Sequence, residues 1–139
     1  MKKRKLFCEY GSVCYAISLF KECRKRDIQD FVVKELKENG INASVINARF
    51  AMPLDSDMVA TLAKEHRLLV TTEENVASGG FGEHVLAYVN HKNLDLKVQI
   101  IAIPDTYVEH GSVDILKEKI GIDADSVYRK VLDIYETMK

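Results

Sequence analysis

Short apolar, β-branched segments alternate with segments of helical periodicity along almost the whole sequence. Predicted strands that alternate with predicted helices are typical of a mostly parallel sheet with helices on both faces. The pattern therefore predicts a single domain, 1–139, with a three-layer α/β/α fold and a five-stranded sheet in which one strand is antiparallel. The predicted strands are 6–10, 13–20, 41–47, 67–72 and 97–103, and the predicted helices are 27–38, 53–63, 81–90, 113–119 and 125–138.

Turn and cap residues set several of these boundaries. Only the short turn Gly11-Ser12 separates the first two predicted strands. They are therefore predicted to pair antiparallel or to be neighbours joined by a sharp bend. Asp27 is predicted to cap the first helix, and Asn39-Gly40 to end it. The helix after Pro53 is expected to turn Met58 and its apolar neighbours inward.

Composition narrows the function classes. The 139 residues carry a net charge of −1, which favours neither nucleic acid nor an anionic membrane as partner. No apolar run of about 18 residues and no signal peptide is present, so cytoplasmic localisation is expected. Cys8, Cys14 and Cys23 form no Cys-x-x-Cys pair, and they are interpreted as reduced thiols.

The carboxyl ends of the strands are where a parallel sheet of this kind meets ligands and partners. Glu73 and Glu74 follow such a strand. As neighbours in an extended segment they point to opposite sides, which argues against a catalytic carboxylate pair. One of them is expected to reach a helix N-terminus, where an anion is stabilised by about 0.3–1 kcal/mol. Arg49 is a candidate ion-pair partner.

The Gly79-Gly80-Phe81-Gly82 segment permits two interpretations. A glycine-rich helix start could hold a phosphate, but the Lys-Ser/Thr of a P-loop and the spacing of a dinucleotide fingerprint are both absent. The structural alternative is favoured: the glycines permit positive φ and close backbone approach, with Phe81 packed underneath.

Histidines and acids elsewhere predict no metal site. Asp105, Glu109 and His110 share one loop, which is interpreted as a polar connection before a helix. His84 and His91 are too few for a metal site, and His91 is expected to lie past the helix end. His66 is expected to be exposed. The residues by themselves predict no catalytic, cofactor-binding or metal-binding group.

Three segments together resemble the C-terminal domain of transketolase-like enzymes. They are Val45–Asp55, Val70–Asn75 with Gly79–Gly82, and Ile103–Ser112. The Pro104-Asp105 and Glu109-His110-Gly111 pieces narrow the resemblance to 1-deoxy-D-xylulose 5-phosphate synthase. The Glu109-His110-Gly111 piece argues against the β-subunits of pyruvate and branched-chain ketoacid dehydrogenases, which share the domain class.

The resemblance implies the context of a larger homodimeric enzyme. That family uses thiamine diphosphate and magnesium to join decarboxylated pyruvate to glyceraldehyde 3-phosphate, for isoprenoid precursor synthesis. Its diphosphate–metal motif begins Gly-Asp-Gly, and no Gly-Asp dipeptide occurs here. The chain is therefore expected to bind no cofactor, and to be inactive as a transferase without the missing catalytic domains.

The expected role is packing on those catalytic domains, within a homodimer. Two alternatives stay open: a separately encoded subunit of a split transketolase-like enzyme, and a small-ligand regulatory module that uses the Gly79–Gly82 helix start. The residues predicted to form the interdomain contact edge are Arg49, Glu73, Glu74, Asn75, Gly79, Gly80, Glu109 and His110.

Overall fold

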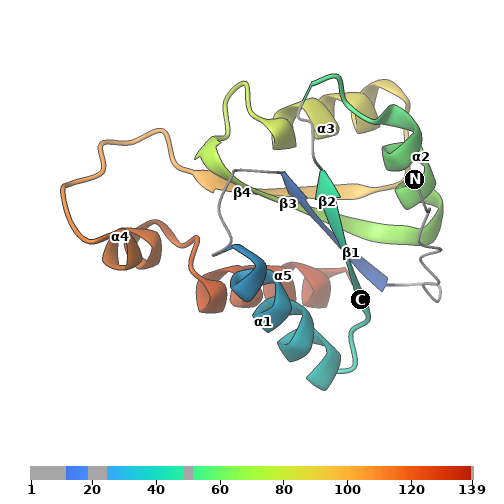
Figure 1. Ribbon diagram of the computed structural model, residues 1–139. Coiled ribbons are helices and arrows are strands. Elements are labelled where there is room, and N and C mark those ends of the chain that lie inside the picture. The colour runs from blue at the N-terminus through green and yellow to red at the C-terminus, as the bar shows by residue number, and fades with distance from the viewer. Residues whose placement is uncertain (1–11, 19–24, 49–51, 139) are drawn as a thin grey trace.

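A computed structural model of the protein describes residues 12–18, 25–48 and 52–138 (Figure 1). Strands and helices alternate from the first described strand up to the last, and two further helices follow it. The elements are β1 (Ser12–Ser18), α1 (Lys25–Glu38), β2 (Ala43–Ala48), α2 (Ser56–Glu65), β3 (His66–Val76), α3 (Phe81–His91), β4 (Lys97–Ile103), α4 (Val113–Ile120) and α5 (Ala124–Thr137).

The described strands form one sheet in the order β2-β1-β3-β4, and every neighbouring pair is parallel. The predicted parallel α/β sheet is confirmed. The predicted antiparallel pairing of 6–10 with the next strand is wrong, because β2 and β3 occupy both edges of β1. Leu6–Tyr10 itself lies outside the described residues.

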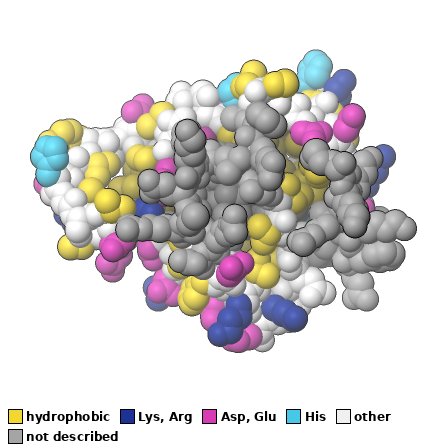
Figure 2. All heavy atoms as spheres, viewed as in Figure 1, with side chains coloured by type: hydrophobic (Ala, Val, Ile, Leu, Met, Phe, Trp, Pro, Cys, Tyr) yellow, Lys and Arg dark blue, Asp and Glu magenta, His cyan; other side chains and the backbone are white. Residues whose placement is uncertain are grey.

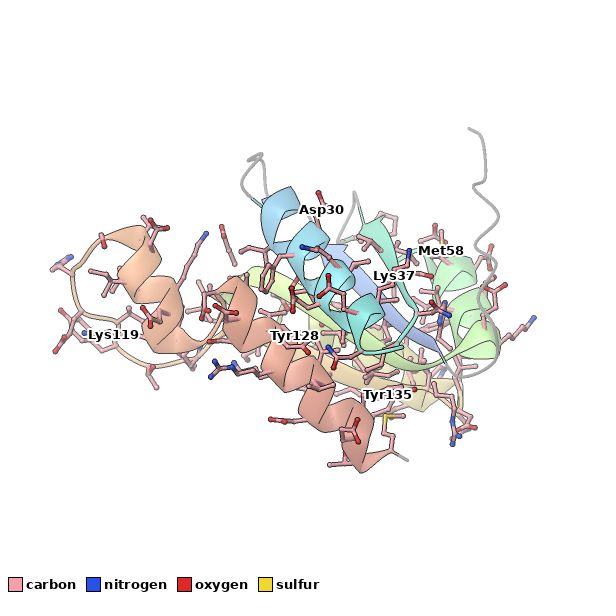
Figure 3. The ribbon with its side chains drawn as sticks, turned by 90° about the horizontal axis from the view of Figure 1, so that it is seen from below. Asp30, Lys37, Met58, Lys119, Tyr128 and Tyr135 are labelled. Atoms are coloured by element: carbon pink, nitrogen blue, oxygen red, sulfur yellow. The ribbon has the colours of Figure 1, made fainter. Side chains whose placement is uncertain are left out.

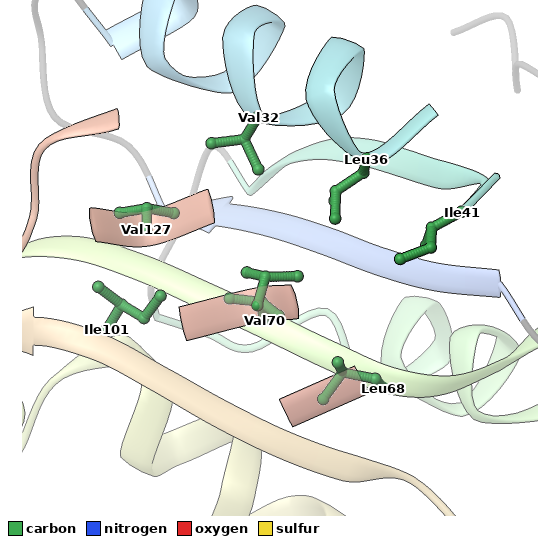
Figure 4. Close-up of a cluster of buried hydrophobic side chains, with 8 residues drawn as sticks. Val32, Leu36, Ile41, Leu68, Val70, Ile101 and Val127 are labelled. Carbon is green, nitrogen blue, oxygen red and sulfur yellow. The ribbon is translucent and has the colours of Figure 1, made fainter. Parts of the chain in front are cut away.

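Helices cover both faces of this sheet (Figure 1). Because successive strand residues point to opposite faces, Leu68 and Val70 of β3 pack under one pair of helices and Leu69 under the other. On the first face, α1 and α5 lie side by side (Figure 3) over the core of Figure 4. Asn39, directly after α1, donates a hydrogen bond of 2.8 Å to the hydroxyl of Tyr128 on α5. The second core joins α2 and α3 through Val59, Leu62, Phe81, Val85 and Val89.

Some predicted boundaries and environments are wrong. α1 begins at Lys25, so Asp27 lies in its first turn instead of capping it. His66 is 2% exposed, because it starts β3 and pairs with Ser12 of β1. His91 is the last residue of α3, and Met58 is 39% exposed. None of the helices in the described part of the chain is long and apolar enough to span a bilayer.

β3 is also longer than predicted. It continues through Glu73, Glu74 and Asn75 to Val76, where pairing resumes with Ile103 of β4 after a register shift. The sequence of Glu73 and Glu74 does not predict this extension. The extension depends on hydrogen bonds to β4, which lies more than 20 residues later in the sequence. The candidate acids therefore belong to a strand rather than to a loop.

Candidate contact edge

Because the strands are parallel, their carboxyl ends meet at one edge of the sheet. Two described segments leave this edge. One turns directly from β3 into α3, and the other is the long loop 104–112 between β4 and α4. Glu73 with Gly79–Gly82 is called the junction below, and Pro104–Ile120 is called the arm. The arm extends from the side of the molecule (Figure 1).

Glu73 caps α3 from the end of β3. Its Oε2 accepts the N–H of Phe81 at 2.9 Å, and its Oε1 accepts the N–H of Gly82 at 3.0 Å. The residue is only 5% exposed. A buried carboxylate is costly unless it is hydrogen-bonded, and here two free N–H groups and the positive end of the helix dipole compensate it. The prediction that one acid reaches a helix N-terminus is confirmed.

The remaining N–H groups of the glycine segment are also occupied. Gly79 donates to Oε2 of Glu83 at 2.7 Å, and Gly80 donates to the carbonyl of Ala77 at 3.0 Å. A Cβ on Gly80 would lie 2.5 Å from Oε2 of Glu73, so the carboxylate lies directly against this backbone. The helix start therefore does not fit a phosphate or diphosphate group, because the protein's own carboxylates and carbonyls hold the donors that such a group would need.

Gly82 has a packing role. A Cβ at this position would lie 2.6 Å from Oγ1 of Thr71 and 2.7 Å from Cγ2 of Ile100. Only glycine lets the first turn of α3 approach the sheet this closely. Gly79 has a φ of 70°, and Phe81 is buried in the second core. The structural interpretation of the glycine segment is confirmed.

Glu74 points away from its neighbour, as predicted for adjacent strand residues. Its carboxylate forms a 3.0 Å ion pair with Nζ of Lys117 on α4, so it joins the end of β3 to the arm.

Within the arm, Glu109 pairs with Lys119 at 3.4 Å, and both side chains are exposed. The predicted contact edge thus divides into a buried junction around Glu73 and an exposed arm that contains Glu109 and His110. Asn75 is exposed, and Arg49 lies outside the described residues.

Sequence reasoning missed the apolar side chains of the arm. Tyr107 is 86% exposed, Val113 57% and Ile115 56%, and α4 buries none of its residues. A signal was present: Val113, Leu116 and Ile120 follow the i, i+3, i+7 spacing of one apolar stripe, whereas Ile115 lies off that stripe. A large aliphatic side chain off the stripe cannot pack on the same surface as the stripe.

The acids and the histidine of the loop 104–112 form no metal-binding group among the described residues. Asp105, Glu109 and His110 are exposed, and Glu109 is paired with Lys119. Among residues 12–18, 25–48 and 52–138, no group of three or more His, Cys, Asp or Glu side chains is placed to hold a metal ion.

Comparisons with known proteins place these features in a family. The model of the family "Transketolase, C-terminal domain" matches residues 31–127. The 1-deoxy-D-xylulose-5-phosphate synthase of Lachnoclostridium phytofermentans is 46% identical over 101 residues, which are 72% of this chain and 16% of that enzyme. The enzyme of the same name from Heliobacterium modesticaldum is 44% identical over 94 residues, 68% of this chain and 14% of that enzyme.

A solved structure shares the fold. It is titled "Split gene transketolase, inactive beta4 tetramer", and it superposes with a TM-score of 0.77 at 22% identity. The match covers 91% of this chain and 40% of that chain. The chain spans only about one sixth of the length of its enzyme relatives, so their match concerns one part of a much larger protein.

Proposed function

Because the chain belongs to the transketolase C-terminal domain family, we propose that it acts as the C-terminal domain of a 1-deoxy-D-xylulose-5-phosphate synthase. The whole enzyme would join decarboxylated pyruvate to glyceraldehyde 3-phosphate. This chain's part is non-covalent: it packs on the catalytic domains and contributes to a homodimer. Two observations carry the proposal: the family model matches residues 31–127, and the synthase relatives match this chain over only about one sixth of their own length.

The junction supports a packing role over a catalytic one. A diphosphate at the Gly79–Gly82 helix start would have to displace Glu73, whose two hydrogen bonds also hold α3 on the sheet. This argues against the small-ligand regulatory module. Thiamine diphosphate and magnesium are therefore assigned to the other domains of the enzyme.

The fold itself extends to a finer proposal. We propose that Leu6–Tyr10 adds a fifth, antiparallel strand at the outer edge of β2, which no described strand occupies. That edge is two strand spacings from β1, about 10 Å, whereas the outer edge of β4 is three spacings away, about 14 Å, so the edge of β2 is the nearer one. Slow amide exchange in β2 that is lost on deletion of residues 1–11 would support this placement, and unchanged exchange would contradict it.

A reconstitution assay tests the proposed function. The chain is mixed with a polypeptide that carries the thiamine diphosphate-binding domains of the enzyme, and product is measured from pyruvate and glyceraldehyde 3-phosphate. We expect a complex and a gain in product over that polypeptide alone. Absence of both would contradict the proposal, and so would micromolar binding of thiamine diphosphate with magnesium to this chain alone in calorimetry.

The same assay addresses the alternative of a separately encoded subunit. A natural subunit should assemble with its partner polypeptide unaided, at micromolar concentrations or below. A domain that normally shares one polypeptide gains from a high effective concentration, so it needs much less intrinsic affinity. The cytoplasmic location stays a prediction.

A further inference from the structure

The arm presents large apolar side chains to solvent. Tyr107 lies in its loop, and Val113 and Ile115 lie on α4. In the space-filling view, hydrophobic side chains and a histidine gather at the end of the molecule that the arm forms (Figure 2). An eight-residue helix has little stability of its own in water. Its conformation must therefore be held by contacts, either within this chain or with a partner.

The contacts within this chain hold only one side of α4. Leu116, Lys117 and Ile120 are the partly buried residues of the helix, and the ion pair between Lys117 and Glu74 ties that side to the end of β3. The rest of α4 is exposed. The unpartnered part of the helix is therefore the side opposite Leu116 and Ile120.

The exposed side combines charge with apolar surface. At about 100° per residue, Asp114 and Glu118 share that side, one turn apart, with Ile115 beside them. Val113 lies next to Ile120 on the helix surface and is exposed at the first residue of the helix. Neither acid forms an ion pair within the described part of the chain. The surface is thus a pair of carboxylates with the large aliphatic side chain of Ile115 on one flank. Its complement is a groove with an apolar wall and with lysine or arginine on its floor.

We propose that the arm is the element that docks this domain onto the catalytic part of the enzyme, by inserting α4 into such a groove. This inference rests on the proposed function. We infer the partner from the length of the relatives. The segment that they share with this chain is 16% of one relative and 14% of another, so each relative contains a large further part onto which the arm can dock. A second copy of this chain fits less well, because a symmetric pairing through α4 would set Asp114 and Glu118 against the same acids.

A matched pair of variants tests the arm. Val113→Ser with Ile115→Ser removes two exposed apolar side chains from α4. Met52→Ser with Met58→Ser removes two others, Met58 from the first turn of α2 and Met52 from the segment before this helix; Met52 is 63% and Met58 39% exposed. Met58 lies at the opposite end of the molecule from Lys119 of the arm (Figure 3). Binding to the polypeptide that carries the thiamine diphosphate-binding domains is measured by calorimetry.

We expect the arm variant to bind at least tenfold more weakly and the α2 variant within twofold of the wild type. Wild-type binding that the arm variant retains would overturn the docking role and leave the proposed function standing. Failure of the wild type to bind at all would overturn both. Self-association of the chain in sedimentation, abolished by the arm variant, would make a second copy the occupant and contradict the proposal.

A charge-reversed variant covers the case in which the serine substitutions disturb folding. Asp114→Lys with Glu118→Lys changes only exposed side chains and leaves both cores intact, and circular dichroism checks that the helix content is kept. We expect at least tenfold weaker binding, because lysines would face the basic floor of the groove. Unchanged or tighter binding would overturn the assignment of that floor.

Discussion

The junction and the arm leave the same edge of one sheet, and both contain acids, yet their environments are opposite. At the junction, Glu73 is 5% exposed and its two oxygens hold the first N–H groups of α3. On the arm, α4 buries no residue and shows its acids and aliphatic side chains to solvent. The difference teaches that an acid at the end of a strand is a candidate for binding a partner only if its carboxylate does not already accept hydrogen bonds from the protein's own backbone.

The largest effect is expected at the junction. Glu73→Ala removes the acceptor of two buried N–H groups and leaves a cavity, so we expect a loss of about 3 kcal/mol in the free energy of unfolding. Urea denaturation measures it. Glu74→Ala is the matched control, and its partly exposed ion pair with Lys117 should contribute less than about 1 kcal/mol. Equal losses for the two neighbours would break the distinction between junction and arm.

A glycine pair gives the next effect. Gly82→Ala would press a methyl group against Thr71 and Ile100, and we expect it to cost about 2 kcal/mol through overpacking. Gly111→Ala, in the arm, has its nearest contact at 3.4 Å to Cδ2 of Leu116 and should change stability by less than about 0.5 kcal/mol. Thermal unfolding of both variants measures the difference. A tolerated Gly82→Ala would show that the junction is less tightly packed than the structure indicates.

Asp123 marks the point where the arm returns to the body, and its carboxylate caps α5 by accepting the N–H of Ser126 at 3.1 Å. Burial raises the pKa of this carboxyl, but the hydrogen bonds from Ser126 and from the backbone of Asp123 and Asp125 together outweigh burial and hold the pKa below its usual value. Asp123→Ala should therefore cost about 1 kcal/mol at pH 7.

The sign of the pH dependence follows from the lowered pKa. The charged form is favoured in the folded state, so the contribution is fully present above the unfolded pKa of about 3.9 and is lost as the pH falls through the lower folded value. The stability difference between wild type and Asp123→Ala should therefore narrow below pH 4 in acid-titrated denaturation curves. A difference that stays constant down to pH 2 would contradict a charged cap.

The smallest effect is expected on the arm itself. Val113→Ser with Ile115→Ser should change the free energy of unfolding by less than about 0.5 kcal/mol, because exposed side chains away from the core contribute little. Denaturant unfolding measures it, with the buried change Val131→Ser as a control that should cost several times more. A loss of 2 kcal/mol or more would mean that α4 packs on the body, and the contrast between the two regions would then fail.

Much of the fold was readable from local pattern. Leu68, Leu69 and Val70 predicted a strand buried on both faces, and the two cores confirm it. Divergence of Glu73 and Glu74 followed from strand geometry alone. What local pattern could not supply was long-range pairing: the central place of β1, the extension of β3 to Val76, and the burial of His66 all depend on strands or residues far away in sequence.

The sequence by itself determined the parallel α/β class and the glycines that α3 needs at its start, because periodicity and steric tolerance are local properties. It also determined the family, through motifs that resemble those of the family. Only the tertiary structure decided which of the two adjacent glutamates caps α3. Glu73 faces a helix end that its own chain brings within 3.0 Å, whereas Glu74 faces Lys117 on a helix that the body holds from one side. Which glutamate caps α3 depends on where α3 and α4 lie in space, and the local sequence Glu73-Glu74 does not determine it.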